Sequence, residues 1–177
     1  LNNYLNETLE TDKDYVVAID TDSVYVCLDE FVKRYKPQNP VNFLDKLCST
    51  VLEDALTKCY DKLYNTLGGI ENKMVMGREV IADRGIWTAK KRYILNVHDN
   101  EGVRYTNPHL KIMGIEAVKS STPASCREKI KEALKIIMGG SEKELNTFIQ
   151  NFREEFMELP PELIAYPRSV NGVKKYT

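Results

Sequence analysis

The clearest pattern in the chain is an apolar repeat between residues 41 and 67. Leucine, cysteine, valine and alanine recur there at steps of three and four positions, which predicts one long amphipathic helix. Gly68 and Gly69 follow and predict its end. A shorter helix is expected over residues 3–9. Runs of β-branched and aromatic residues predict a hairpin over 15–27 and further strands over 73–83, 86–98, 103–105 and 110–118.

The pattern changes after about residue 120, where two more helices are predicted. Ser121 or Thr122 is expected to cap the first, which ends at the glycines near residue 139. Ser141 and Glu144 have the spacing of a capping box and predict the start of the second, which runs to about residue 159. The whole pattern predicts an α+β fold. An antiparallel sheet packs with the long helix first, and a mainly helical part follows a boundary near residue 114.

Composition and charge narrow the choice of function. The 177 residues are 42% hydrophobic and 29% charged, as expected for a soluble globular chain with one domain, or one domain and part of another. The net charge of -1 argues against a general nucleic-acid binder. Acidic residues are in excess over 1–60 and basic residues over 84–135, a division suited to a metal and a polyanion, or simply to uneven solvated helix faces. Four cysteines without a C-x-x-C pair predict buried, reduced thiols rather than a zinc site.

Two aspartates stand between the two apolar runs of the first predicted hairpin. Asp20 and Asp22 are two positions apart, so both carboxylates are expected at its tip. Neighbouring carboxylates repel, and a divalent cation relieves the repulsion. Mg²⁺ takes one or two protein carboxylates together with water and phosphate oxygens, which suits phosphoryl or glycosyl chemistry on a nucleotide. A solvated turn is the alternative interpretation.

A basic run follows Trp87 on a segment that is otherwise apolar. Lys90, Lys91 and Arg92 are expected on one strand, alternating between its faces, with Tyr93 next to them. Phosphate or minor-groove contact would explain such a strand, and so would protection of a sheet edge. Lys111 and Lys119 extend the basic region. Glu79 is expected inside a half-buried strand, where it needs a metal or an ion-pair partner.

Four motifs in order resemble the family B DNA polymerases. Asp20-Thr21-Asp22-Ser23 is similar to the D-T-D-S motif of that family, and Lys90-Lys91-Arg92-Tyr93 is similar to its K-K-R-Y motif. Two further stretches are similar to the replicative polymerases of large tailed bacteriophages. They are Met76-Gly77-Arg78-Glu79 and Leu110-Lys111-Ile112-Met113-Gly114, the latter followed by Lys119-Ser120-Ser121-Thr122-Pro123. The resemblance covers essentially the whole chain, although Ala18-Ile19 replaces the usual Tyr-Gly and the stretch 83–85 is shorter than the expected glycine-rich loop.

The resemblance implies a role for each motif. Residues 1–114 would be the C-terminal part of a polymerase palm, and residues 115–177 the start of a thumb. Asp22 would be the direct ligand of two catalytic Mg²⁺ ions, Asp20 its acidic neighbour and weaker ligand, and Glu79 a carboxylate close to that site. Lys91, Arg92 and Tyr93 would hold the primer near its terminus, and Lys119 would meet the DNA backbone. Lys90 and Lys111 would also bind DNA.

The resemblance also implies an activity and its partners. The reaction would be metal-dependent nucleotidyl transfer from a dNTP to a primer 3′-hydroxyl on a DNA template, in the cytoplasm of an infected bacterial host. The family needs a further metal-binding aspartate and a helix that grips the triphosphate, and both are expected before Leu1. The 177 residues alone are therefore predicted to be inactive without the remainder of the polymerase. A sliding clamp is an expected partner of the complete protein.

Two other functions remain open from the residues alone. A D-x-D motif after an apolar strand also occurs in nucleotide-sugar glycosyltransferases, but that function does not explain the basic residues at 90–92. A non-catalytic DNA-binding subunit of a larger assembly is the other alternative, and it predicts DNA binding that does not depend on metal.

Overall fold

The computed structural model describes residues 1–169 and 171–175 of the chain. Helices and antiparallel sheets make up the structure, so the predicted α+β fold is confirmed. The residues form two compact units that alternate along the chain. The first unit holds residues 1–83 and 97–108, and the second holds residues 84–96 and those from 109 onward. The predicted division into palm and thumb near residue 114 stays a prediction.

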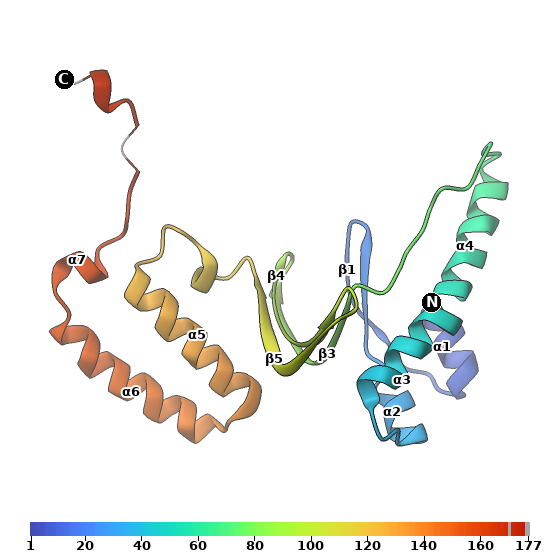
Figure 1. Cartoon of the computed structure of the whole chain (residues 1–177), viewed down its shortest axis with the longest axis horizontal. Helices are drawn as coiled ribbons and strands as arrows, with labels where there is room; N and C mark the ends of the chain where they lie inside the picture. Colours follow the sequence, from blue (N-terminus) through green and yellow to red (C-terminus); the bar gives the residue numbers. More distant parts are fainter. Residues whose placement is uncertain (170, 176–177) are drawn as a thin grey trace. The chain divides into compact units, whose positions relative to one another are not determined.

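The first unit opens with helix α1 (Asn2–Leu9) and a two-stranded antiparallel hairpin, β1 (Val16–Asp20) and β2 (Ser23–Val26). After the short helix α2 (Asp29–Tyr35), helix α3 (Pro40–Leu47), the π-helical turn η1 (Cys48–Leu52) and helix α4 (Glu53–Thr66) follow one another along a single path (Figure 1). The long helix is thus confirmed, with a π turn inside it that periodicity did not predict. The buried core of the first unit draws on four segments of the chain and consists of Leu5, Leu9, Tyr15, Phe31 and Leu52.

A three-stranded sheet has the order β3-β4-β5, with strands at Val80–Ala89, Arg92–Asn100 and Val103–Met113. Each strand contributes one part to each unit. The predicted strand ends were wrong here. Strand β3 runs straight through residues 84–86, where a break was expected, and the chain reverses instead at Lys90 and Lys91. Lys91 has a left-handed backbone with a φ of 60°, the conformation that such a two-residue reversal needs.

Two expectations about charged residues change with these strand ends. Lys90 and Lys91 form a turn and do not alternate across a strand, so only Arg92 of the three cations belongs to β4. Glu79 precedes β3 and is exposed, so it is not a charge inside a half-buried strand. The turn between β4 and β5 has left-handed backbone at both Glu101 and Gly102.

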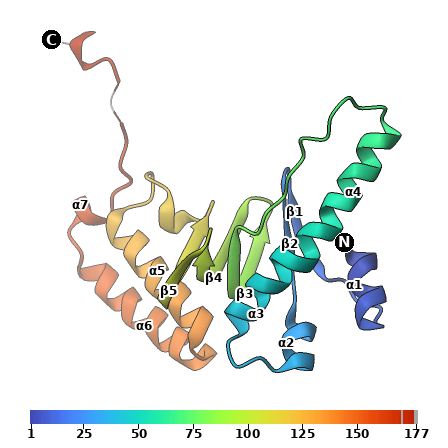
Figure 2. The ribbon, with the colours of Figure 1, turned by 45° about the vertical axis from the view of Figure 1, so that its right-hand side comes forward.

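The second unit is mainly helical after its share of the sheet. A 3-10 turn, η2 (Glu116–Val118), leads to helices α5 (Ala124–Gly139), α6 (Glu142–Glu158) and α7 (Pro161–Ile164), and a last turn, η3, spans Val173–Lys175. Helices α5 and α6 lie side by side (Figures 1 and 2). The buried core joins strand, turn and helix residues, namely Ile94, Ile115, Ala117, Leu134 and Met138.

Several local expectations for this part can be compared with the structure. The capping box is confirmed, because the Ser141 hydroxyl accepts from the Glu144 N–H and the Glu144 carboxylate accepts from the Ser141 N–H. The cap at Ser121 or Thr122 was wrong, since α5 begins after Pro123 without a side-chain cap. The strand expected over 110–118 ends at Met113, because Gly114 adopts a left-handed φ of 65°.

The four cysteines are free, as predicted, but Cys27 and Cys59 are exposed rather than buried. Burial raises the pKa of the Cys48 thiol to about 11, so this side chain stays protonated at neutral pH. Among the residues that the structure describes, no helix has both the length and the apolar character needed to cross a membrane.

Candidate functional site

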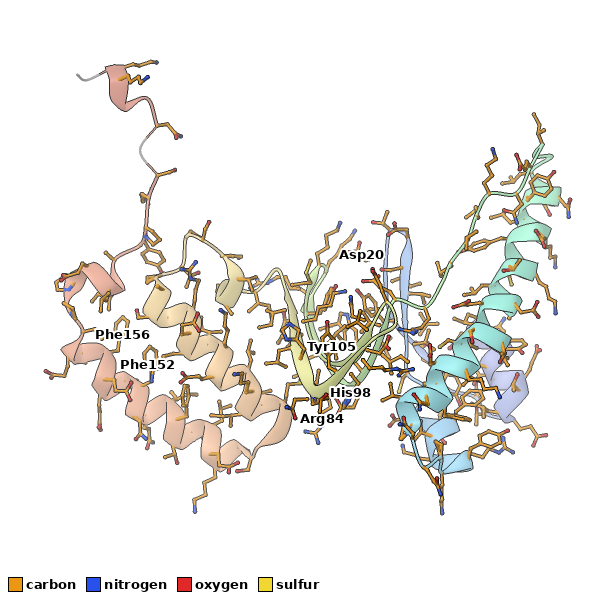
Figure 3. All side chains as sticks on the ribbon, viewed as in Figure 1. Asp20, Arg84, His98, Tyr105, Phe152 and Phe156 are labelled. Carbon is orange, nitrogen blue, oxygen red and sulfur yellow. The ribbon has the colours of Figure 1, made fainter. Side chains whose placement is uncertain are left out.

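The acidic hairpin of the first unit has a tip of two residues. Asp20 pairs with Ser23 as the last rung of the β1–β2 ladder, and Thr21 and Asp22 form the turn between them. Thr21 has a φ of 54°, the left-handed conformation required by the tight reversal. The structure therefore places both predicted carboxylates at the tip. Figure 3 labels Asp20 at this end of β1.

Local hydrogen bonds hold the half-buried aspartate of the tip. The Thr21 hydroxyl donates to Asp20 Oδ1 over 3.2 Å, and the Ser23 hydroxyl donates to the Asp20 carbonyl oxygen over 3.1 Å. Asp22 is exposed in the turn. The D-T-D-S order thus yields one aspartate held against the strand and one presented to solvent. Ile19, the bulky residue in place of glycine, has 71% of its surface exposed.

Glu79 lies in the same unit, directly after a strongly anchored arginine. Its own carbonyl accepts from the Glu101 N–H over 2.7 Å. The Arg78 N–H donates to Glu53 Oε1 over 2.8 Å, and the Arg78 side chain is only 12% exposed. Backbone contacts to α4 and to the β4–β5 turn therefore fix the position of Glu79.

A buried ion-pair network surrounds Asp99, which is fully buried. Arg78 binds Asp99 through Nη1, and its Nη2 binds Asp45 Oδ1 at 2.6 Å. Arg104 contacts the same two carboxylates, with Nη2 2.7 Å from Asp45 Oδ2 and Nε 3.0 Å from Asp99 Oδ2. The Gly102 N–H adds a hydrogen bond to Asp99 Oδ1 over 3.0 Å. The network joins α3, the segment before β3 and both sides of the β4–β5 turn.

The basic turn of the second unit connects β3 to β4. Lys90 and Lys91 are exposed in it, and Arg92 begins β4 half-buried. Tyr93 is buried, with its ring centroid 6.3 Å from that of Trp87. Both rings therefore help to hold the turn in place, and the two lysines are its most exposed cations.

Gly114 brings a second segment against the basic turn. A Cβ atom at this position would overlap the Lys91 carbonyl oxygen and lie 3.1 Å from Arg92 Cγ, so the close approach requires glycine. Two residues later Glu116 accepts from Arg92 Nη2 on both of its oxygens, at 2.7 and 2.6 Å. Lys119 donates to the same carboxylate over 3.0 Å. Lys111 is half-buried on β5.

These contacts divide the predicted site residues into groups. Asp20 and Asp22 come together at the acidic tip, and Glu79 belongs to the same unit, directly before β3. In the second unit Arg92 and Lys119 meet on Glu116, next to the lysines of the turn. Within the part of the chain that the structure describes, no group of three or more His, Cys, Asp or Glu side chains is arranged to hold a metal ion.

Sequence reasoning missed three residues that organise these regions. Arg78 was predicted only as part of the Met76–Glu79 motif, and no role was predicted for Glu116 or Asp99. Asp99 stands at the end of an apolar segment, two positions after Val97. A charged residue at such a position was the one indication in the sequence that a buried charge would need partners. No spacing in the sequence indicated that Arg104 would be one of these partners, or that Asp45 would contact the same two arginines as Asp99.

Comparison with known proteins adds an independent line of observation. No protein-family model matches the chain. Two curated proteins do, and both are named DNA-directed DNA polymerase. The one from Enterobacteria phage T4 is 37% identical over 191 residues, and the one from Escherichia phage RB69 is 36% identical over 191 residues. Each match covers 99% of this chain.

This chain is therefore related to a segment of phage DNA polymerases. The resemblance inferred from the four motifs is confirmed over almost the whole length. The chain spans about a fifth of the length of these relatives, 21% in each case. The name DNA-directed DNA polymerase therefore belongs to proteins about five times as long as this chain.

Proposed function

We propose that this chain is the segment of a DNA-directed DNA polymerase that carries the D-T-D-S tip and the K-K-R-Y turn. In the complete protein it would serve nucleotidyl transfer from a dNTP to a primer 3′-hydroxyl. Residues 1–114 would form the C-terminal part of the palm and residues 115–177 the start of the thumb. The 37% identity to the phage T4 polymerase over 99% of the chain is the observation that carries this proposal.

The chemistry of the hairpin tip supports the catalytic part. Asp20 and Asp22 offer two carboxylates on one tight turn, the donor type and number that a single protein segment contributes to Mg²⁺. The exposed Asp22 would be the direct ligand of the metal ions, and Asp20, held by the Thr21 hydroxyl, the weaker one. When bound, divalent cations would lower the pKa of the attacking hydroxyl and neutralise charge on the leaving pyrophosphate. Two ions need further carboxylates, for which Glu79 is the candidate in this chain.

The exposed cations of the second unit support the DNA-binding part. Lys90 and Lys91 stand in solvent on a turn that is braced by Gly114 and by the rings of Trp87 and Tyr93. A rigid cationic turn suits contact with the phosphates of a primer strand, because little conformational freedom is lost on binding. Arg92, Lys111 and Lys119 extend the same basic region.

A chimeric enzyme tests the catalytic proposal. Residues 1–177 of this chain would replace the matched segment of the phage T4 polymerase, and primer extension would be measured with Mg²⁺. We expect extension that is lost on Asp22→Asn and kept on Asp14→Asn, a change at an exposed aspartate before β1. A folded chimera that extends primers equally well with Asp22→Asn would contradict the assignment of Asp22.

The isolated chain tests the division of labour. We expect it to bind primer–template DNA without extending it, since its tip supplies only part of a two-ion site. Lys91→Ala should lower the slope of log affinity against log salt by about one unit, and Lys143→Ala on α6 should leave it unchanged. Extension by the pure chain would refute the expected inactivity. Binding of a UDP-sugar in place of DNA would support the glycosyltransferase alternative.

A further inference from the structure

One carboxylate lies among the cations that are proposed to meet DNA. Glu116 contacts Arg92 Nη2 through both oxygens at 2.7 and 2.6 Å, and Lys119 Nζ through Oε1 at 3.0 Å. All three side chains remain between 40 and 47% exposed. Arg92 Nε makes no hydrogen bond within the described residues although it is buried. The three side chains are therefore accessible to solvent, and Glu116 does not take up all the hydrogen-bond donors of Arg92.

The backbone holds this carboxylate in place from two sides. Gly114 packs directly on the Lys91 carbonyl oxygen, and Ile115 and Ala117 are buried in the core with Ile94. Glu116 lies between these two anchors at the start of η2. Its position therefore does not depend on its ion pairs, and the carboxylate would stay near Arg92 and Lys119 even when those side chains turn to another anion.

The carboxylate also keeps its charge under all ordinary conditions. Hydrogen bonds from Lys119 and from the backbone, with the charge of Arg92 nearby, lower the pKa of Glu116 to about 2. A carboxylate with two oxygens toward an arginine and a lysine presents the same acceptor pattern as a phosphate group. Such an anion competes directly with the phosphates of a nucleic acid.

We propose that the Glu116 carboxylate occupies a phosphate-binding position formed by Arg92 and Lys119, and that a DNA phosphate replaces it when the duplex binds. This inference rests on the proposed DNA-binding function and adds a competing group to it. In free protein the carboxylate orders both cations and offsets one of their two positive charges. On binding, Arg92 and Lys119 exchange one anion for another.

The exchange has a measurable consequence for affinity. Each phosphate contact that requires displacement of Glu116 releases fewer counterions and gains less energy than a contact made by a free cation. Removing the carboxylate's charge should therefore strengthen DNA binding. If Glu116 instead only positioned Arg92 for a contact with DNA, removing its charge would weaken DNA binding, because the guanidinium could then move away.

The test is a titration of the 177-residue chain with labelled primer–template DNA at several salt concentrations. We expect Glu116→Gln to bind about three- to tenfold tighter at low salt and to steepen the salt slope by about one unit. The control is Glu128→Gln on α5, which removes the same charge from an exposed carboxylate paired with a lysine three residues later. This control should change affinity much less than Glu116→Gln.

Two further variants keep the outcome decisive. Glu116→Ala should show the same gain, with thermal unfolding as the check that both variants fold. In an Arg92→Ala, Lys119→Ala background, Glu116→Gln should give no gain, because the competing carboxylate no longer has cations to occupy.

Weaker binding by Glu116→Gln, or a gain equal to that of Glu128→Gln, would overturn the proposal. The proposed DNA contact would survive that result if Lys91→Ala still lowered the salt slope. Absence of DNA binding by the unmodified chain and by every variant would overturn both.

Discussion

The two ion-pair clusters of this chain contain the same kinds of groups in opposite surroundings. The Asp99 cluster of the first unit joins two arginines and two aspartates, and one of these aspartates, Asp99, has no exposed surface. The Glu116 cluster of the second unit joins an arginine, a lysine and one carboxylate that all remain 40–47% exposed. Both connect segments far apart in sequence. Burial decides which of them holds the fold and which is available for exchange.

The difference follows from the cost of an unpaired charge. A buried charge that loses its partner cannot be hydrated, so breaking such a pair strongly destabilises the protein. An exposed charge recovers its interaction with water, so breaking its pair costs little. The Asp99 cluster is thus expected to carry stability, and the Glu116 cluster is free to change partners.

The largest effect is expected from breaking the buried cluster. Asp99→Asn leaves Arg78 and Arg104 with less negative charge to face, and Arg78 is only 12% exposed. We expect a loss of about 3–5 kcal/mol in the free energy of unfolding, measured by urea denaturation. Asp45→Asn is the matched control, because Asp45 contacts the same two arginines but is 38% exposed. A loss as large for Asp45 as for Asp99 would show that burial is not the deciding factor.

An intermediate effect is expected from the backbone that supports the exposed cluster. Gly114→Ala places a methyl group against the Lys91 carbonyl at a left-handed φ of 65°. The overlap and the strained backbone together should cost about 1–3 kcal/mol of unfolding free energy. Gly139→Ala on α5 is the control, since nothing lies within 4 Å of the added carbon, and it should be neutral or slightly stabilising. Equal losses for both glycines would argue against close packing at Gly114.

The smallest effect is expected from the exposed carboxylate itself, and it depends on pH. The pKa of Glu116 is lowered from 4.5 to about 2, so its stabilising contribution is complete above the unfolded pKa. That contribution is lost as the pH falls through the folded value. Glu116→Gln should therefore be slightly less stable than the unchanged chain at pH 7 and equally stable near pH 2, so its stability falls less between about pH 4.5 and pH 2. Urea midpoints at several pH values would measure this. A large loss for the variant at pH 7 would make Glu116 a structural residue.

Local sequence patterns predicted several of these features, for reasons that are themselves local. The two-residue acidic tip at Asp20 and Asp22 follows from β-forming runs on both sides of turn residues. The capping box at Ser141 and the α+β class follow from spacing alone. The strand ends around Gly85 could not be predicted in this way, because a glycine inside a strand and a glycine that ends one look alike without the neighbouring strands.

The candidate site was predictable only in part. D-T-D-S and K-K-R-Y identified Asp20, Asp22 and the basic turn, and the comparison with phage polymerases supports the relationship that these motifs suggested. The structure moved Lys90 and Lys91 from a strand into a turn and moved Glu79 out of one. The ion-pair network around Asp99 could not be foreseen, since two of its members, Asp45 and Arg104, are 59 positions apart in the chain.

By itself, the sequence determined the kinds of elements, the position of the acidic tip and the relationship to phage DNA polymerases, because each depends on residues that are neighbours along the chain. Only the tertiary structure decided which charges are buried and which stay open. Asp99 and Glu116 are both acidic residues near turns, and their different surroundings arise from contacts made by distant segments. The cost of removing a charge from water depends on those contacts, which is why composition and spacing did not distinguish the two.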